Sequence, residues 1–170
     1  INGQLAGASS GHADDDRVRL ALIGPSLAYG DYDILDIVHD CGGNVVIEDI
    51  FEGIRDYWHT VRPAPDAVEA LARSYLLDKT PRMFMRSSVS SRIDDILRLT
   101  REFKADAVIW YQLVCCELYD EEAFVFEKRL QEAGLPMLTI EADYGGLRAG
   151  TVRTRVEAFI EMIQGGVADA

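Results

Sequence analysis

The stretch from Asp106 to Glu122 decides the fold and reads Asp-Ala-Val-Ile-Trp-Tyr-Gln-Leu-Val-Cys-Cys-Glu-Leu-Tyr-Asp-Glu-Glu. Its apolar run, Ala107 to Tyr111, predicts a buried β-strand, and the acidic residues from Asp120 onward predict the start of a helix. The adjacent cysteines Cys115 and Cys116 fall in the loop between the two. Ligands of open parallel sheets bind beyond the carboxyl ends of the strands, so this cysteine pair stands where chemistry is expected.

Around this stretch, short apolar runs alternate with segments of helical periodicity. Three further strands are predicted at 18–23, 44–50 and 136–140. Helices are predicted after a cap at Asp31 or Asp33, from Pro65 to Leu77, from Arg92 (capped by Ser90 or Ser91) to Phe103, from Asp120 to Ala133 and from Thr151 to Ile163. Residues 80–85 fit either a short strand or an extended loop. The alternation predicts an α/β three-layer sandwich with a parallel, flavodoxin-like or Rossmann-like sheet of roughly four strands.

Length and composition indicate one domain. The chain has 170 residues, 48% of them hydrophobic, which is enough for a single α/β core. The first residue is Ile1, and residues 1–16 are rich in Gly, Ala, Ser and Asp. We therefore expect 1–16 to be a linker and 17–165 to be an α/β domain, the C-terminal part of a longer subunit.

Charge and cysteine content exclude several classes of protein. The formal charge of −12 argues against a nucleic-acid partner, because phosphate binding relies on clustered Lys and Arg. No apolar run is long enough to span a membrane and no signal peptide is evident, so we expect a cytoplasmic protein. Three cysteines without framework spacing favour reduced thiols or metal ligands over disulfides.

Common cofactor and catalytic motifs are missing. Gly24-Pro25-Ser26 follows the first strand but matches no dinucleotide or phosphate-loop motif, which disfavours a nicotinamide site. The three histidines are too scattered to suggest zinc, and no serine stands in a nucleophile elbow.

The cysteines differ in what their positions predict. Cys41, at a helix end before two glycines, is interpreted as a core residue. Cys115 and Cys116 lie in a loop, where packing is not an obvious reason for two thiols. Adjacent cysteines do not easily ligate one cluster together, and an iron–sulfur cluster needs more than one protein ligand. Our hypothesis is that Cys116 holds part of an iron–sulfur cluster whose other ligands lie outside this chain.

Charged and aromatic residues suggest secondary candidates. The segment from Phe51 to Arg62 fits either a clamp for an acidic substrate, through Arg55, Arg62, Tyr57 and Trp58, or a protein interface. Glu141 and Asp143 are interpreted as a solvated pair, with ligand or metal binding as the alternative. Arg153 and Arg155 are expected to pair with those acidic residues rather than to bind an anion.

Three stretches together resemble one known family. Val108 to Tyr119, Glu132 to Tyr144 and Val152 to Phe159 resemble the C-terminal domain of the 2-hydroxyacyl-CoA dehydratase and benzoyl-CoA reductase family. The resemblance covers about residues 17–164 and is most specific in its last third.

The resemblance implies a subunit of an oxygen-sensitive heterodimer with a [4Fe-4S] cluster held by three cysteines. One of them occupies the Cys-x-x-Tyr position that here is Cys116 with Tyr119, and the others belong to a preceding N-terminal domain. An ATP-dependent activator supplies one electron, and the acyl-CoA thioester becomes a ketyl radical anion. That radical expels a hydroxyl group in the dehydratases or proceeds to ring reduction in the reductases. Gln112 and Tyr119 are candidates to hydrogen-bond the cluster or substrate.

Departures from the family pattern keep alternatives open. Many members have further cysteines near the positions of Phe51 and of Pro81 to Met83, and this chain has none there. Both a catalytic and a supporting subunit are therefore consistent with the sequence. The alternative from another class is a non-catalytic scaffold or partner-binding domain, in which Cys115 and Cys116 are buried thiols and Tyr57-Trp58 is a partner surface.

Overall fold

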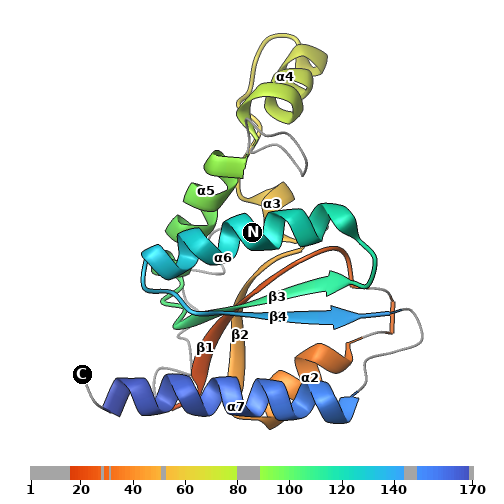
Figure 1. Cartoon of the computed structure of the whole chain (residues 1–170). Coiled ribbons are helices and arrows are strands. Elements are labelled where there is room, and N and C mark those ends of the chain that lie inside the picture. The colour runs from red at the N-terminus through yellow and green to blue at the C-terminus, as the bar shows by residue number, and fades with distance from the viewer. Residues whose placement is uncertain are drawn as a thin grey trace.

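Four parallel strands form one open sheet in the order β2-β1-β3-β4 (Figure 1). The computed structural model describes residues 16–27, 29–30, 32–50, 53–79, 89–143 and 149–168. The strands are β1 (Val18–Ile23), β2 (Gly43–Asp49), β3 (Ala107–Leu113) and β4 (Met137–Ala142). The predicted α/β class and the parallel, flavodoxin-like or Rossmann-like sheet are confirmed.

Helices cover both faces of the sheet and make it the middle of three layers. Helices α2 (Asp33–Asp40) and α7 (Ala149–Ala168) cover one face, and α5 (Val89–Glu102) and α6 (Glu117–Glu132) cover the other (Figure 1). Alternate strand residues point to opposite faces, so Leu22 and Ile109 enter the first core while Ile23 and Trp110 enter the second.

Helix α7 packs as its sequence predicts. Its apolar stripe is buried against the sheet and consists of Val152, Val156, Phe159, Ile160 and Ile163. Their spacing of three and four residues places them on one side of the helix. Gly134, with φ of 74°, follows the end of α6 and ends that helix as expected.

Several predicted helix starts are wrong. Tyr32, not an aspartate side chain, stands at the N-cap of α2, and Asp33 is already helical. Ser90 and Ser91 lie inside α5 rather than capping it. Helix α6 begins at Glu117, three residues before the predicted Asp120, with Cys116 at its N-cap. These helices are held by packing, since neither Tyr32 nor Cys116 makes a side-chain cap hydrogen bond.

The helix predicted from Pro65 to Leu77 exists in a different form. Asp66 caps α4 (Ala67–Arg73) by accepting hydrogen bonds from the amides of Val68 and Glu69. The chain then continues as a π-helix, η1 (Ser74–Asp78). The apolar positions at helical spacing, Val68, Leu71, Ala72 and Tyr75, do not form a buried stripe but are exposed.

Some predictions fall on residues that the structure does not describe. Residues 1–15, most of the predicted linker, and 80–85, the ambiguous strand or loop, are among them. A short helix, α3 (Ile54–Tyr57), lies within the irregular segment from Phe51 to Arg62. Among the described helices, none is long and apolar enough to cross a membrane.

Candidate functional site

The carboxyl end of β3 projects beyond its neighbour β1. The last residue of β1, Ile23, pairs with Trp110, whereas β3 continues to Leu113 alongside β4. The chain leaves β1 toward β2 on one side while β3 lies on the other, so a topological switch point falls between β1 and β3. Ligands of open α/β sheets bind outside the strand ends at such a point.

Gly24 lets the chain pass close to β3 at this switch point. A Cβ atom at Gly24 would lie 2.3 Å from the Tyr111 carbonyl oxygen, which is backbone and cannot move aside on its own. The Gly24 amide instead donates to the Asp49 carbonyl at the end of β2. The glycine of the Gly-Pro-Ser sequence therefore serves a tight strand exit.

The two cysteines occupy the turn that joins β3 to α6. The Val114 amide donates to the Ala142 carbonyl and extends the ladder with β4 by one bond, and the Cys116 amide donates back to Leu113. Cys115 has φ of 65°, a left-handed conformation that is uncommon for a residue other than glycine. Cys115 is exposed, while Cys116 is half-buried against the core beneath α5 and α6. In this structure neither thiol is fully buried.

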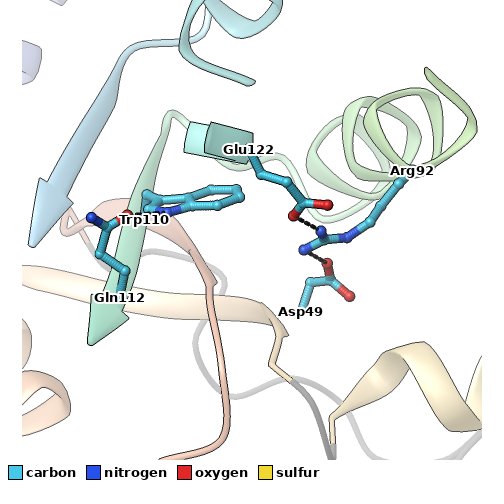
Figure 2. A network of polar contacts seen from close by, with 5 residues as sticks. All are labelled: Asp49, Arg92, Trp110, Gln112 and Glu122. Atoms are coloured by element: carbon cyan, nitrogen blue, oxygen red, sulfur yellow. Dashed lines mark hydrogen bonds and ion pairs between the residues drawn. The ribbon is translucent and has the colours of Figure 1, made fainter. Parts of the chain in front are cut away.

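The Gln112 side chain links the cysteine turn to neighbouring elements by hydrogen bonds. Its side chain is buried, and its amide oxygen accepts a hydrogen bond from the Trp110 indole N–H at 2.9 Å (Figure 2). Its amide nitrogen donates to carboxylates of Asp120 on α6, at 3.2 Å, and Glu141 on β4, at 3.1 Å. One side chain thus links β3, β4 and the first turn of α6 beside Cys116.

Tyr119 lies in the interior rather than at the surface of the site. It is 1% exposed and its ring meets that of Trp110 edge-on, with centroids 5.9 Å apart. Its contact with Trp110 anchors the start of α6 to β3. Of the three predicted site residues, the structure brings Gln112 and Cys116 to the edge of the sheet and directs Tyr119 into the core.

A buried ionic cluster lies next to this core. The Arg92 guanidinium of α5 donates through Nη1 to Glu122 of α6 and lies 3.8 Å, through Nη2, from the Asp49 carboxylate (Figure 2). All three residues are less than 9% exposed, and the guanidinium also stands 5.2 Å from the Phe126 ring centre. Attraction between these charges offsets part of the cost of removing them from water. The cluster joins α5, α6 and the end of β2.

Sequence reasoning missed this cluster, although a signal was present. Arg92 lies four residues before Ile96 and seven before Leu99, on the stripe that packs inward. Glu122 lies three after Tyr119 and four before Phe126, again on a buried stripe. A charged residue at a core position of a helix requires a buried partner. The pairing of Arg92 with Glu122 was missed because the two residues lie on different helices.

Two cavities adjoin these features. One, of about 340 Å³ and open to solvent, lies beyond the end of β4 and is lined by Val114, Glu141, Asp143, Thr151 and Arg155 among others. The other, of only about 30 Å³, is lined by Trp58, His59, Ile96, Arg92 and Asp49 among others. The first is adjacent in sequence to the cysteine turn, so it is the better candidate for a substrate.

The secondary candidates have ordinary structural partners. Arg153 pairs with Asp40 of α2 at 3.1 Å, and Arg155 donates to the Thr139 carbonyl at 2.8 Å, so the expected pairing with Glu141 or Asp143 is wrong. Trp58 packs against the Phe103 ring and beneath the Arg98 guanidinium, whereas Tyr57 is exposed. The Arg55 side chain lies outside what the structure describes.

Cys41 lies far from the other cysteines in the topology, at the end of α2 just before β2 begins. It is half-buried and packs against the α2–α7 core. Burial raises the pKa of its thiol, an effect that the Arg153 guanidinium partly opposes. Within the described part of the chain, no three His, Cys, Asp or Glu side chains come together to hold a metal ion.

The sequence from residue 3 to residue 163 matches the family described as 2-hydroxyglutaryl-CoA dehydratase, D-component. The chain belongs to this family. The expected family resemblance is therefore confirmed, and the cysteine turn after β3 lies within the matched region.

Two curated proteins illustrate the relationship of this dehydratase-family chain to longer proteins. It is 27% identical over 150 residues to "Putative dehydratase subunit YjiM" of Escherichia coli strain K12, covering 88% of the chain and 38% of that protein. It is 24% identical over 131 residues to the (R)-phenyllactyl-CoA dehydratase beta subunit of Clostridium sporogenes, covering 77% of the chain and 34% of that subunit. The chain thus spans little more than a third of the length of these relatives.

Proposed function

We propose that this chain forms the α/β domain of a 2-hydroxyacyl-CoA dehydratase-type enzyme, in which Cys116 is one ligand of a [4Fe-4S] cluster. The observation that carries the proposal is the position of Cys116. Its half-buried thiol stands in the turn after β3, beside the switch point of the sheet, in a chain of the dehydratase family. We place the site at this turn because the carboxyl ends of the strands are where such folds bind ligands.

The residues present fit one corner of such a cluster and no more. Thiolates are the usual ligands of iron–sulfur clusters, and the half-buried Cys116 is exposed enough to bind one. The described residues contain no group of three metal-binding side chains, and we propose that the other ligands lie outside them, in the part of the subunit that precedes this chain. A cluster bound there would supply the single electron that turns a thioester into a ketyl radical anion.

In this proposal Gln112 and Tyr119 hold the turn that carries Cys116 in position. The amide of Gln112 is engaged by Trp110, Asp120 and Glu141, so it fixes the Cys116 turn rather than binding the cluster itself. Tyr119 is buried against Trp110 and holds the first turn of α6 in place. Both therefore set the direction in which the Cys116 thiol points.

The acyl group of the substrate would occupy the cavity beyond β4. Its volume of about 340 Å³ lies at the lower end of the range of small-molecule sites, and it begins at Val114, next to Cys115. On its wall the two carboxylates Glu141 and Asp143 outnumber the one cation, Arg155, so this wall and the charge of −12 disfavour the phosphates of coenzyme A in the same place. We therefore place only the acyl end of the acyl-CoA here and its phosphates on another part of the enzyme.

Partners follow from the same proposal. The relative from Clostridium sporogenes is named a beta subunit, which supports a second, homologous subunit beside this one. We further propose, from the family resemblance, that an ATP-dependent activator protein delivers the electron.

Anaerobic turnover tests the function. The enzyme, assembled with its partner subunit, activator and ATP, is given 2-hydroxyglutaryl-CoA, and loss of water to the 2-enoyl-CoA is followed by mass spectrometry. Wild type is expected to form the enoyl product, Cys116→Ser to form none, and Cys41→Ser, which removes a thiol from the other end of the sheet, to match wild type. Equal turnover by the two variants would contradict the role of Cys116. Reduction of benzoyl-CoA in place of dehydration would identify a reductase-type subunit.

A further inference from the structure

One edge of the Arg92 guanidinium, made by Nε and Nη2, lies on the side of the Asp49 carboxylate (Figure 2). Nη1 donates to Glu122, whereas Nε and Nη2 have no hydrogen-bond acceptor within the described part of the chain, although both are buried. The planar guanidinium directs one N–H bond of each of these nitrogens the same way, so they form a fork of two donors. Buried donors usually have an acceptor, which makes this fork a candidate binding site.

The Asp49 carboxylate stands near this fork without forming a hydrogen bond to it. Its Oδ2 atom lies 3.8 Å from Nη2 of Arg92, beyond the length of a hydrogen bond. Asp49 is only 7% exposed, so the acceptor and the two donors are held apart in the interior of the protein. A small molecule that accepts from the fork and donates to the carboxylate would bridge them.

The smaller of the two cavities adjoins both groups. Arg92 and Asp49 line it together with Trp58, His59 and Ile96 among others, and its volume is about 30 Å³. A cavity needs roughly 10–15 Å³ of such volume to hold one water, and a buried water needs about two to four polar partners. The cavity therefore has room for a water but not for a substrate, and the fork and Asp49 supply enough partners.

The charges around the cavity and the ionic cluster disfavour an anion at the fork. Among the described residues, carboxylates outnumber guanidinium groups there when histidine is counted as neutral. The carboxylates are those of Asp49, Asp95 and Glu122, and the guanidinium groups are those of Arg92 and Arg98. An anion would be repelled by this excess of negative charge, and an apolar molecule would leave the buried donors unpaired. A neutral molecule that both accepts and donates fits best.

We propose that the cavity is the binding site of one ordered water molecule, which accepts hydrogen bonds from Nε and Nη2 of Arg92 and donates to the Asp49 carboxylate. The water is then a fixed part of the ionic cluster. It joins α5 to the end of β2 across the 3.8 Å that separates Nη2 from Asp49. The site belongs to this chain alone and depends neither on an iron–sulfur cluster nor on an acyl-CoA.

A high-resolution crystal structure of the wild-type protein tests the proposal. Density for one water is expected at about 2.7–3.2 Å from Nε and Nη2 of Arg92 and within hydrogen-bond distance of Asp49. Direct contact of the Asp49 carboxylate with the fork, or a cavity without density, overturns the proposal. Crystals grown with bromide in place of chloride separate water from a halide, since an anomalous signal at this position would identify an anion and also overturn it.

Oxygen-17 relaxation dispersion of the solvent, which counts long-lived internal waters, tests the same site in solution. Arg92→Met removes the fork and is expected to lower the count by one. Arg98→Met, a matched change on the wall of the same cavity, is expected to leave the count unchanged. Circular dichroism checks that both variants are folded, and the crystal structure decides alone if Arg92→Met does not fold. An equal count in wild type and folded Arg92→Met overturns the proposal.

Discussion

At the carboxyl end of β3, the amide of Gln112 accepts a hydrogen bond from Trp110 and donates to Asp120 and Glu141. Gln112→Leu keeps the approximate volume but leaves the buried indole N–H of Trp110 without its acceptor. An unsatisfied buried donor costs about 1–3 kcal/mol, so we expect the free energy of unfolding to fall by that amount in urea titrations. Gln131→Leu, at an exposed position of α6, is the control and should change it by less than about 0.5 kcal/mol. Equal stability of both variants would mean that the Gln112 hydrogen bonds contribute nothing.

The thiols should differ in reactivity. Cys115 is exposed, whereas Cys41 is half-buried and burial raises the pKa of its thiol. Since the thiolate is the nucleophile, Cys41 holds less of the reactive form near neutral pH, and its disadvantage shrinks as the pH rises toward its raised pKa. Mass spectrometry of the protein after brief iodoacetamide treatment at several pH values measures this. Faster labelling of Cys41 than of Cys115 at neutral pH would contradict the assigned burial.

The positions of the loop cysteines were easier to predict from the sequence than the contacts of the core residues. Cys115 and Cys116 follow an apolar run, so their position after a strand could be predicted from local sequence alone. The partners of Gln112 could not, because Glu141 is 29 residues away and meets it only once β3 and β4 pair. The burial of Tyr119 was missed for the same reason, as it depends on Trp110 across the helix–sheet contact.

Among the elements, β2, α5 and α6 are joined by the Arg92 cluster. Arg92→Met would remove the cation that pairs with the buried Glu122 carboxylate and lies beside Asp49. Breaking a buried ion pair in this way costs about 3–5 kcal/mol, which chemical denaturation should detect. Arg98→Met, on the same helix but 41% exposed and paired with Asp95 and Glu102, is the control and should cost less than about 1 kcal/mol. A loss no greater than that of the control would show that the cluster is dispensable.

The exit of β1 depends on a glycine. Gly24→Ala would push a methyl group into the Tyr111 carbonyl of β3, so we expect it to destabilise the protein by about 1–3 kcal/mol. Gly165→Ala, where an added methyl group in α7 meets nothing within 4 Å, should stabilise by up to about 1 kcal/mol through helix propensity. Urea midpoints of the two variants should therefore move in opposite directions. If both moved the same way, the close approach of β1 and β3 at Gly24 would be wrong.

Strands were predicted better than helix boundaries. β1 matches its apolar run at both ends, because that run is buried on both faces and ends at Gly-Pro. β3 extends two residues past its prediction, since the polar Gln112 remains in the ladder with β4. The start of α6 was misplaced because its N-cap, Cys116, is not a capping residue type, and the acidic run that suggested Asp120 lies inside the helix. The exposure of the apolar residues of α4 could not be predicted, because their spacing in the sequence matches that of a buried helix face.

At the scale of the whole molecule, the sheet order β2-β1-β3-β4 brings the cysteine turn, the Gln112 contacts and the cavity beyond β4 to one edge. The Arg92 cluster joins α5 and α6 to the end of β2, and α4 stands away from the sheet (Figure 1). The alternation of strands and helices was sufficient to predict the parallel sheet. It could not predict which helices meet across a face, because that depends on long-range packing.

The content of iron and acid-labile sulfide tests the central claim, that Cys116 holds a cluster, most directly. The protein is purified anaerobically with its partner subunit as wild type, Cys116→Ser and Cys41→Ser. We predict that Cys116→Ser lowers iron by about four atoms per heterodimer, the content of one [4Fe-4S] cluster, while Cys41→Ser retains the wild-type amount. Equal iron in the two variants, or none in wild type, would contradict the assignment of Cys116 as a cluster ligand.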